Sequence, residues 1–119
     1  MDNQRIELLK YRGHNSTVFT GRPEGKLARK DLGLDEKDSD AVVYTVIIPR
    51  KTTSFNSSFF LGLFYDSIKA LGSIEKFNQK YVFEIEEQDA EWKEILERNL
   101  AECRRKATNE LNHTTGIDF

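Results

Sequence analysis

Residues 42–64 read VVYTVIIPRKTTSFNSSFFLGLF, and this stretch decides the fold class. Its first part, residues 42–48, is rich in β-branched side chains and apolar on both alternating faces, which is typical of a central strand covered on both sides of its sheet. Pro49 ends the strand, because proline has no N–H to donate to the sheet. Residues 57–71 then predict a helix with an apolar stripe wide enough for a largely buried position, and Gly72 suits the left-handed residue that closes it.

On either side of this stretch, further strands and helices alternate. Residues 80–85 alternate between apolar and polar side chains and predict a strand nearer the edge of the sheet. Residues 22–32 predict a short helix that has Pro23 in its first turn and ends at Gly33. Residues 89–107 predict the clearest helix, with acidic residues early, basic residues late and a single apolar stripe. That stripe comprises Trp92, Ile95, Leu96, Leu100, Cys103 and Ala107.

The two ends of the chain show weaker patterns. Residues 5–11 and 16–20 predict two short strands, joined by a turn at residues 12–15. The polar run at residues 35–40 predicts a surface loop. Residues 108–119 contain few apolar side chains and predict a loosely held tail.

The predicted elements follow the order β-β-α-β-α-β-α. This order predicts an α/β (α+β) fold in which a mixed β-sheet of about four strands packs against helices. Leu, Ile, Val and Phe make up 32 of the 119 residues, which is about 27% and above the roughly 20% below which disorder is expected. We therefore expect one domain over residues 1–107, followed by a C-terminal tail over residues 108–119.

Composition narrows the class of protein. Eighteen Lys and Arg against 20 Asp and Glu give a net charge of -2, so nucleic acid is not the expected partner. No apolar run approaches the roughly 20 residues that span a bilayer, and the first residues lack a secretory-signal pattern. The single cysteine, Cys103, excludes an internal disulfide and a multi-cysteine zinc site. We expect a cytoplasmic protein with no membrane association.

A hydroxyl-rich segment at residues 50–58 joins the predicted central strand to the predicted buried helix. Ligands gather at the carboxyl ends of strands in open α/β sheets, and the free N–H groups of a helix start attract anions. We therefore expect the segment to favour an anionic group, either a bound phosphate or a phosphorylated serine. The candidate residues of this binding loop are Arg50, Lys51, Thr52, Thr53, Ser54 and Asn56.

The same residues also have a structural explanation. Serine and asparagine are the commonest residues at a helix N-cap, so Asn56, Ser57 or Ser58 would close the helix start without any ligand. Arg50 and Lys51 would then be ordinary solvated side chains. The glycines of the N-terminal third are too widely spaced to form a Gly-rich phosphate loop.

Over residues 42–64 a strand, a short loop, a turn and an apolar helix follow one another, with Ser57-Ser58-Phe59-Phe60 at the turn. This pattern resembles the STAS fold of sulfate-transporter C-terminal domains and anti-sigma factor antagonists, and most closely a small bacterial STAS-like family of unknown function. The resemblance covers roughly residues 16–107. Asn56 and Phe59 stand where the antagonists' Asp-Ser-Ser-Gly-like turn has aspartate and glycine.

The resemblance implies a regulatory role for the turn. In the antagonists, a partner kinase phosphorylates the first serine of the turn, and phosphorylation weakens docking to that partner. The matching position is Ser57, with Ser58 as its neighbour, so both are candidate phospho-acceptors. The protein partner that the resemblance implies is a histidine-kinase-like ATPase.

These observations leave two functions open. The first expectation is a non-catalytic regulatory or protein-interaction domain that is switched by phosphorylation at Ser57. The alternative is a domain that binds a nucleotide or another small phosphate compound with the same loop. An enzyme is not expected, because Ser57 has only the distant His14 and His113 as possible bases. No metal-ligand set emerges, no cofactor is expected, and the sequence does not indicate an oligomeric state.

Other notable side chains have structural explanations. Cys103 and Trp92 share one apolar stripe, so we expect both in the core. The basic cluster at residues 104–106 is expected at a helix C-terminus, where it would complement the helix dipole. The basic residues between 22 and 30 predict a solvated helix face.

Overall fold

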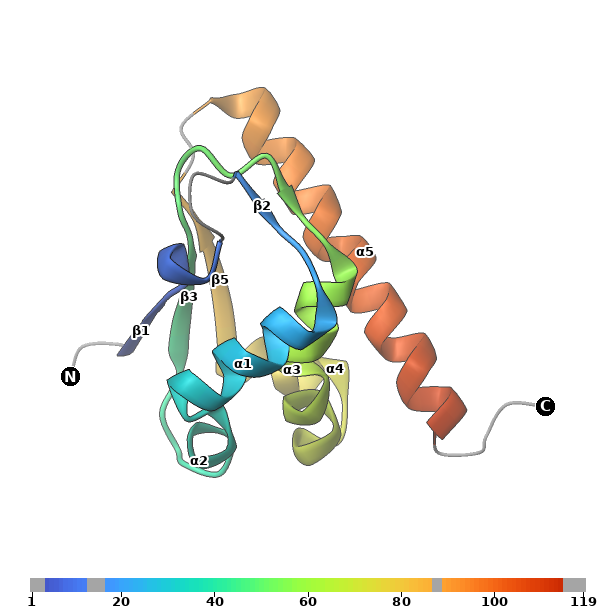
Figure 1. Ribbon diagram of the computed structural model, residues 1–119. Helices are drawn as coiled ribbons and strands as arrows, with labels where there is room; N and C mark the ends of the chain where they lie inside the picture. The colour runs from blue at the N-terminus through green and yellow to red at the C-terminus, as the bar shows by residue number, and fades with distance from the viewer. Residues whose placement is uncertain (1–3, 13–16, 87–88, 115–119) are drawn as a thin grey trace.

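The main sheet has three parallel strands, and the strand expected to be central lies in the middle (Figure 1). The computed structural model describes residues 4–12, 17–86 and 89–114. Across this sheet the strands are β1 (Gln4–Glu7), β3 (Tyr44–Ile48) and β5 (Tyr81–Ile85). A second, two-stranded sheet pairs β2 (Val18–Phe19) with β4 (Ser54–Phe55), also in parallel.

The helices pack around these two sheets. They are α1 (Arg22–Leu32), α2 (Leu34–Asp38), α3 (Ser57–Leu71), α4 (Ile74–Lys80) and α5 (Ala90–Thr114), with a 3-10 turn η1 (Leu9–Tyr11). Helix α1 crosses α3, and the long α5 runs beside β4 and α3 (Figure 1). No helix in the described part of the chain is both long enough and apolar enough to cross a bilayer.

An aromatic cluster holds α3 against the main sheet. Tyr44 and Tyr81 are partners in the β3–β5 register, and their rings stack with centroids 5.7 Å apart. Phe64 of α3 contacts the rings of Phe77, Tyr81 and Phe83 at centroid distances of 5.0, 5.1 and 5.7 Å. Aromatic pairs at such distances add to the free energy of area burial, which explains why the sequence of α3 is so rich in phenylalanine.

The crossing of α1 and α3 depends on two glycines. A Cβ added to Gly25 would lie 2.3 Å from the carbonyl oxygen of Phe59, and one added to Gly62 would lie 2.2 Å from that of Arg22. Glycine inside a helix costs about 1 kcal/mol relative to alanine. Here that cost is offset because the two backbones approach more closely than any larger residue would permit.

Several sequence-based expectations are confirmed. The fold class is α/β, α1 and α3 have the predicted bounds, and Gly33 and Gly72 close them in the left-handed conformation. Strand β3 is central and β5 lies at an edge. Cys103 is buried on the inner face of α5.

The expected number and arrangement of strands are wrong. Five strands form two sheets instead of about four strands in one mixed sheet, and all the pairings within the described residues are parallel. The expected hairpin is absent because β1 pairs with β3, whereas β2 pairs with β4. Of its turn, only Arg12 lies inside the described residues. Pairing partners of this kind lie far apart in the chain, so local patterns do not indicate them.

The helices also differ from expectation in three places. Residues 35–38 of the expected surface loop belong to α2, which begins at Leu34 directly after Gly33 and buries Leu34 and Asp38. Helix α4 was not predicted, although Ser73 is a recognisable N-cap whose Oγ accepts from the N–H of Lys76 at 3.2 Å. Helix α5 continues to Thr114 instead of ending at residue 107, so the first part of the expected tail is helical.

Three side-chain expectations are corrected as well. Trp92 is 42% exposed instead of lying in the core. The reason is its position in the first turns of α5, which extend past the end of the main sheet (Figure 1). The cluster at residues 104–106 lies well inside α5 and not at its C-terminus. Arg29, expected on a solvated face, is buried.

Candidate functional site

The hydroxyl-rich segment leaves the carboxyl end of β3 and reaches α3 by way of β4. Figure 1 shows the segment passing over the end of the main sheet and then descending beside α5. The sequence predicted a direct passage from strand to helix. The inserted strand β4 therefore separates the cations Arg50 and Lys51 from the serines at the start of α3.

Thr52 stabilises the first turn of the segment and is buried, with 1% of its surface exposed. Its Oγ1 donates to the carbonyl of Pro49 at 2.8 Å and accepts from Nη1 of Arg12 at 2.8 Å. The same guanidinium nitrogen donates to the carbonyl of Arg50 at 2.9 Å. Thr52 is thus occupied by the protein itself. The role of Arg12 was missed because its partners lie about 40 residues away, as the separations of 38 and 40 show.

Thr53 and Ser54 join the second sheet. The Thr53 N–H donates to the carbonyl of Thr17 at 2.7 Å, and the two threonine hydroxyls are 2.8 Å apart. Ser54 is half-buried and is the register partner of Val18 in β4. Both residues therefore anchor the segment, which reduces the number of expected binding-loop residues that remain accessible.

Asn56 is the N-cap of α3. Its Oδ1 accepts from the N–H of Ser58 at 2.7 Å, and its own N–H donates to the carbonyl of Phe19 at 2.9 Å. The structural explanation of Asn56 is therefore confirmed. Because Asn56 caps the helix, the hydroxyls of Ser57 and Ser58 are not needed for capping.

The two serines occupy the first turn of α3 and differ in exposure. Ser57 is half-buried, whereas Ser58 is exposed. Neither hydroxyl forms a hydrogen bond with another described residue. A phosphate on either serine would lie at the positive end of a 15-residue helix, where negative charge is favoured.

Lys51 has an unusual backbone. Its φ is 68°, in the left-handed region that residues other than glycine rarely adopt. Arg50 and Lys51 both have exposed side chains. Strained backbone of this kind occurs both at functional sites and in tight turns. In this loop it lies beside two exposed cations.

Helix α5 forms the neighbouring wall of the site. The N–H of Phe55 donates to Oδ1 of Asn99 at 2.9 Å, and Sγ of Cys103 lies 3.6 Å from the carbonyl oxygen of Phe55. Burial raises the pKa of the Cys103 thiol to about 12. The thiol therefore stays protonated near neutral pH and acts as a small core side chain instead of a nucleophile.

No catalytic constellation is found among the described side chains. His14 and the side chain of His113 lie outside them, so the two expected candidate bases cannot be placed near Ser57. Within the described part of the chain, no three His, Cys, Asp or Glu side chains lie close enough together to hold a metal ion.

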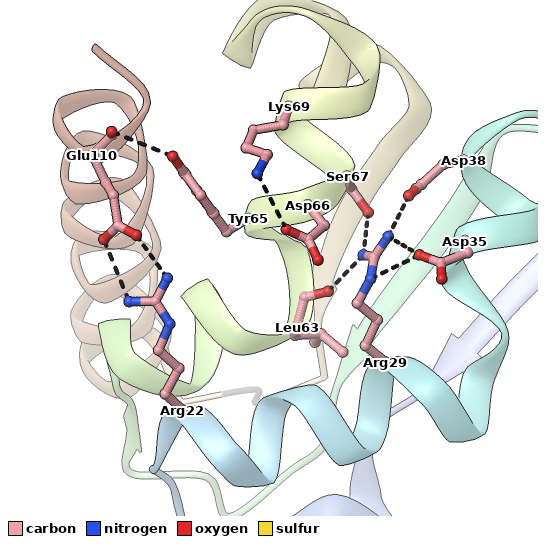
Figure 2. Close-up of polar contacts among 10 residues, drawn as sticks. All are labelled: Arg22, Arg29, Asp35, Asp38, Leu63, Tyr65, Asp66, Ser67, Lys69 and Glu110. Atoms are coloured by element: carbon pink, nitrogen blue, oxygen red, sulfur yellow. Dashed lines mark hydrogen bonds and ion pairs between the residues drawn. The ribbon is translucent and has the colours of Figure 1, made fainter. Parts of the chain in front are cut away.

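Ion pairs account for some of the basic residues. Nη2 of Arg22 lies 2.7 Å from Oε2 of Glu110, which links the start of α1 to the last turns of α5 (Figure 2). Arg105 pairs with Glu102 at 2.6 Å on the exposed side of α5. Arg104 differs from both, because its guanidinium lies in a groove between α5 and β5 that the sequence did not reveal.

Comparison with family models, curated proteins and solved structures finds no match to this chain. The resemblance to STAS domains therefore stays a prediction, and the function has to be argued from the site itself.

Proposed function

We propose that the chain is a non-catalytic regulatory domain that binds a partner protein through the loop at residues 50–53 and the start of α3. The observation that carries this proposal lies in the first turn of α3, where Asn56 caps the helix and leaves two adjacent serine hydroxyls unused, the half-buried Ser57 and the exposed Ser58. The STAS-like pattern of the sequence supports a partner of the histidine-kinase-like ATPase class.

Phosphorylation of Ser57 is the proposed switch, with Ser58 as the more exposed neighbour. A phosphate adds about two negative charges and three acceptor oxygens. The helix dipole stabilises this charge within the domain. A partner docked over the same turn would have to accommodate a charged group where it had packed against a small neutral hydroxyl, so binding weakens.

The test measures complex formation with purified histidine-kinase-like ATPases that are encoded near this chain. Wild type and Ser57→Ala are expected to bind alike, whereas Ser57→Asp binds at least tenfold more weakly. Ser58→Asp, measured beside it, shows which hydroxyl faces the partner. Ser39→Asp is the matched control, because it adds the same charge at an exposed serine next to α2.

Equal binding by all the variants, or binding by none of them, would refute the proposed switch. A second measurement uses the wild-type chain incubated with ATP and the bound ATPase. Mass spectrometry is then expected to find phosphate on Ser57 or Ser58 and on no other residue.

A small phosphate compound is the second candidate ligand, and the left-handed backbone at Lys51 favours it. This conformation holds two consecutive cations at the carboxyl end of the central strand. In open α/β folds, this edge of the sheet is where ligands bind.

Thermal unfolding in the presence of nucleotides and inorganic phosphate tests this second function. A ligand at 100 times its Kd stabilises the folded state by about 2.7 kcal/mol. An increase in Tm that Arg50→Gln abolishes would support the ligand site. No increase with any nucleotide or with phosphate would exclude it and leave the protein partner as the candidate.

A further inference from the structure

A groove of about 490 Å³ separates the edge strand β5 from α5. Residues 82–85 and Thr45 form its sheet wall. Lys93, Glu97, Leu100 and Arg104 form its helix wall. Neither serine of the α3 start lines the groove, so it is a second surface and does not depend on the function proposed above.

The sheet wall presents backbone groups with which no other described strand pairs. The N–H of Glu86 donates to the carbonyl of Ile48 at 2.9 Å, so this residue turns its backbone toward β3. Neighbouring residues of a strand direct their N–H and C=O groups to opposite sides. Val82 and Glu84 therefore pair with β3, whereas Phe83 and Ile85, which line the groove, direct their backbone groups away from β3. No other described strand pairs with this edge.

The helix wall presents the cation of Arg104, for which the described residues supply no ion-pair partner. The guanidinium of Arg104 lies over the ring of Phe83, 5.4 Å from its centroid. Its Nε is buried and has no hydrogen-bond partner among the described residues. No carboxylate in the described part of the chain forms an ion pair with it, and loss of solvent lowers the pKa of the guanidinium. A buried donor without an acceptor costs free energy, and an anionic group bound in the groove would supply a counter-charge to the guanidinium that carries this donor.

We propose that this groove binds an extended peptide segment of a partner protein, which pairs with Phe83 and Ile85 as an additional strand and places one acidic side chain against Arg104. Strand addition at an exposed sheet edge is an established mode of peptide recognition, in which the main chain gives affinity and side-chain contacts give specificity. Here Arg104 is the specificity contact.

An extended peptide can pair with the outer edge of β5 and also place a carboxylate against Arg104. The other occupants considered would satisfy only one of these two walls. A free anion would satisfy Arg104 but leave the backbone of β5 unpaired. A second folded copy would have to bring its own strand edge past the wall formed by α5, whereas a single extended segment enters from the open side of the groove. Glu84 and Glu97 also line the groove, so a peptide with a single acidic residue fits better than a polyacidic one.

The first experiment selects binders from a displayed library of random ten-residue peptides, using the full-length chain. The enriched peptides are expected to share one acidic residue between strand-forming residues. Arg104→Gln is expected to weaken their binding at least tenfold. Arg98→Gln is the matched control, because Arg98 is an exposed arginine of α5 that pairs with Glu94 outside the groove. Absence of enriched peptides, or equal binding by both variants, overturns the proposal.

The second experiment uses only the wild-type chain, so it stands even if Arg104→Gln fails to fold. Methylation of alternate peptide amides is expected to abolish binding, while methylation of the intervening amides leaves it unchanged. Bound peptide is expected to slow hydrogen exchange at the Phe83 and Ile85 amides. Binding that tolerates methylation at every position overturns the proposal.

Two other results would identify a different occupant. Slowed exchange of the Phe83 and Ile85 amides at high protein concentration without peptide, together with a dimer in sedimentation, would assign the groove to a second copy. Chemical-shift changes at Arg104 with acetate alone, and none with peptides, would assign it to a free anion. Either result overturns strand addition by a partner peptide.

Discussion

The guanidinium of Arg29 is held inside the protein by acceptors from two other helices (Figure 2). Nη1 donates to the carbonyl of Leu63 at 3.0 Å and to Oγ of Ser67 at 2.8 Å, and Nη2 lies 2.6 Å from Oδ2 of Asp38. The hydroxyl of Tyr81 donates to the other oxygen of Asp38 at 2.6 Å. Burial and Asp38 raise the pKa of Tyr81. This network joins α1, α2, α3 and β5.

Arg29→Met is expected to lower the free energy of unfolding by about 3–5 kcal/mol, because it leaves the carboxylate of Asp38 buried without its counter-charge. Urea denaturation measures the change. Arg98→Met is the matched control, since Arg98 forms an exposed pair whose loss costs less than about 1 kcal/mol. A loss of the same small size for Arg29→Met would show that the network contributes little.

Because folding lowers the pKa of Asp40, we expect the free energy of unfolding to depend on pH. Hydrogen bonds from Lys80 and Tyr44 lower the pKa of Asp40 to about 2. A carboxyl whose pKa falls on folding contributes stability above its unfolded pKa, about 4, and loses it as the pH falls through its folded pKa. We expect Asp40→Asn to flatten the decline of unfolding free energy between about pH 4 and pH 2.

Urea denaturation at a series of pH values provides the measurement for Asp40. Asp66→Asn is the control, because Asp66 is an exposed carboxyl on α3 whose nearest cation, Lys69, is 3.9 Å away. If Asp40→Asn declines as steeply as wild type over this range, another carboxyl is responsible for the acid sensitivity.

Among the helices and strands, local signals predicted both ends of α1 and α3 but not how the helices meet. Pro23, Gly33 and Gly72 mark the ends of α1 and α3 by their own backbone preferences. The contact of Gly25 with Gly62 was not predictable, because nothing near either glycine indicates that two helices cross there. In the sequence, Gly25 only weakened the prediction of a helix.

Gly62→Ala is expected to destabilise the protein by about 1–3 kcal/mol, the usual cost of forcing extra atoms into a packed contact. Alanine otherwise favours a helix over glycine, so a loss identifies the crossing as its cause. Thermal unfolding measures the change, with Lys69→Ala on the exposed side of α3 as the control. Increased stability of Gly62→Ala would mean that the two helices lie farther apart than described.

For the molecule as a whole, the position of a strand in the main sheet predicts how readily its backbone hydrogen bonds open to solvent. Among the described strands, β3 is bonded on both sides, whereas β5 is bonded on one side only. Amides in central strands exchange by global unfolding, and exposed ones exchange by local opening. Successive N–H groups of β5 point alternately toward β3 and away from it. We therefore expect its amides to divide into a slowly exchanging and a rapidly exchanging set.

Hydrogen exchange in the free protein is expected to be slow at Val82 and Glu84 and fast at Phe83 and Ile85. Amides of β3 should be as slow as the global free energy of unfolding allows. NMR measures each rate at a fixed pH. Equal protection at all four β5 residues would show that another segment already covers the edge.

Local patterns in the sequence predicted the α/β class, the central strand, its edge neighbour, and the ends of α1 and α3. These features follow from the side-chain periodicity and backbone preferences of neighbouring residues. Three features became visible only in the folded structure: the two parallel sheets, the burial of Thr52 under Arg12, and the position of Arg104 in a groove where no described carboxylate pairs with it. Each of these depends on residues far apart in the chain, whose encounter is set by packing and not by local pattern.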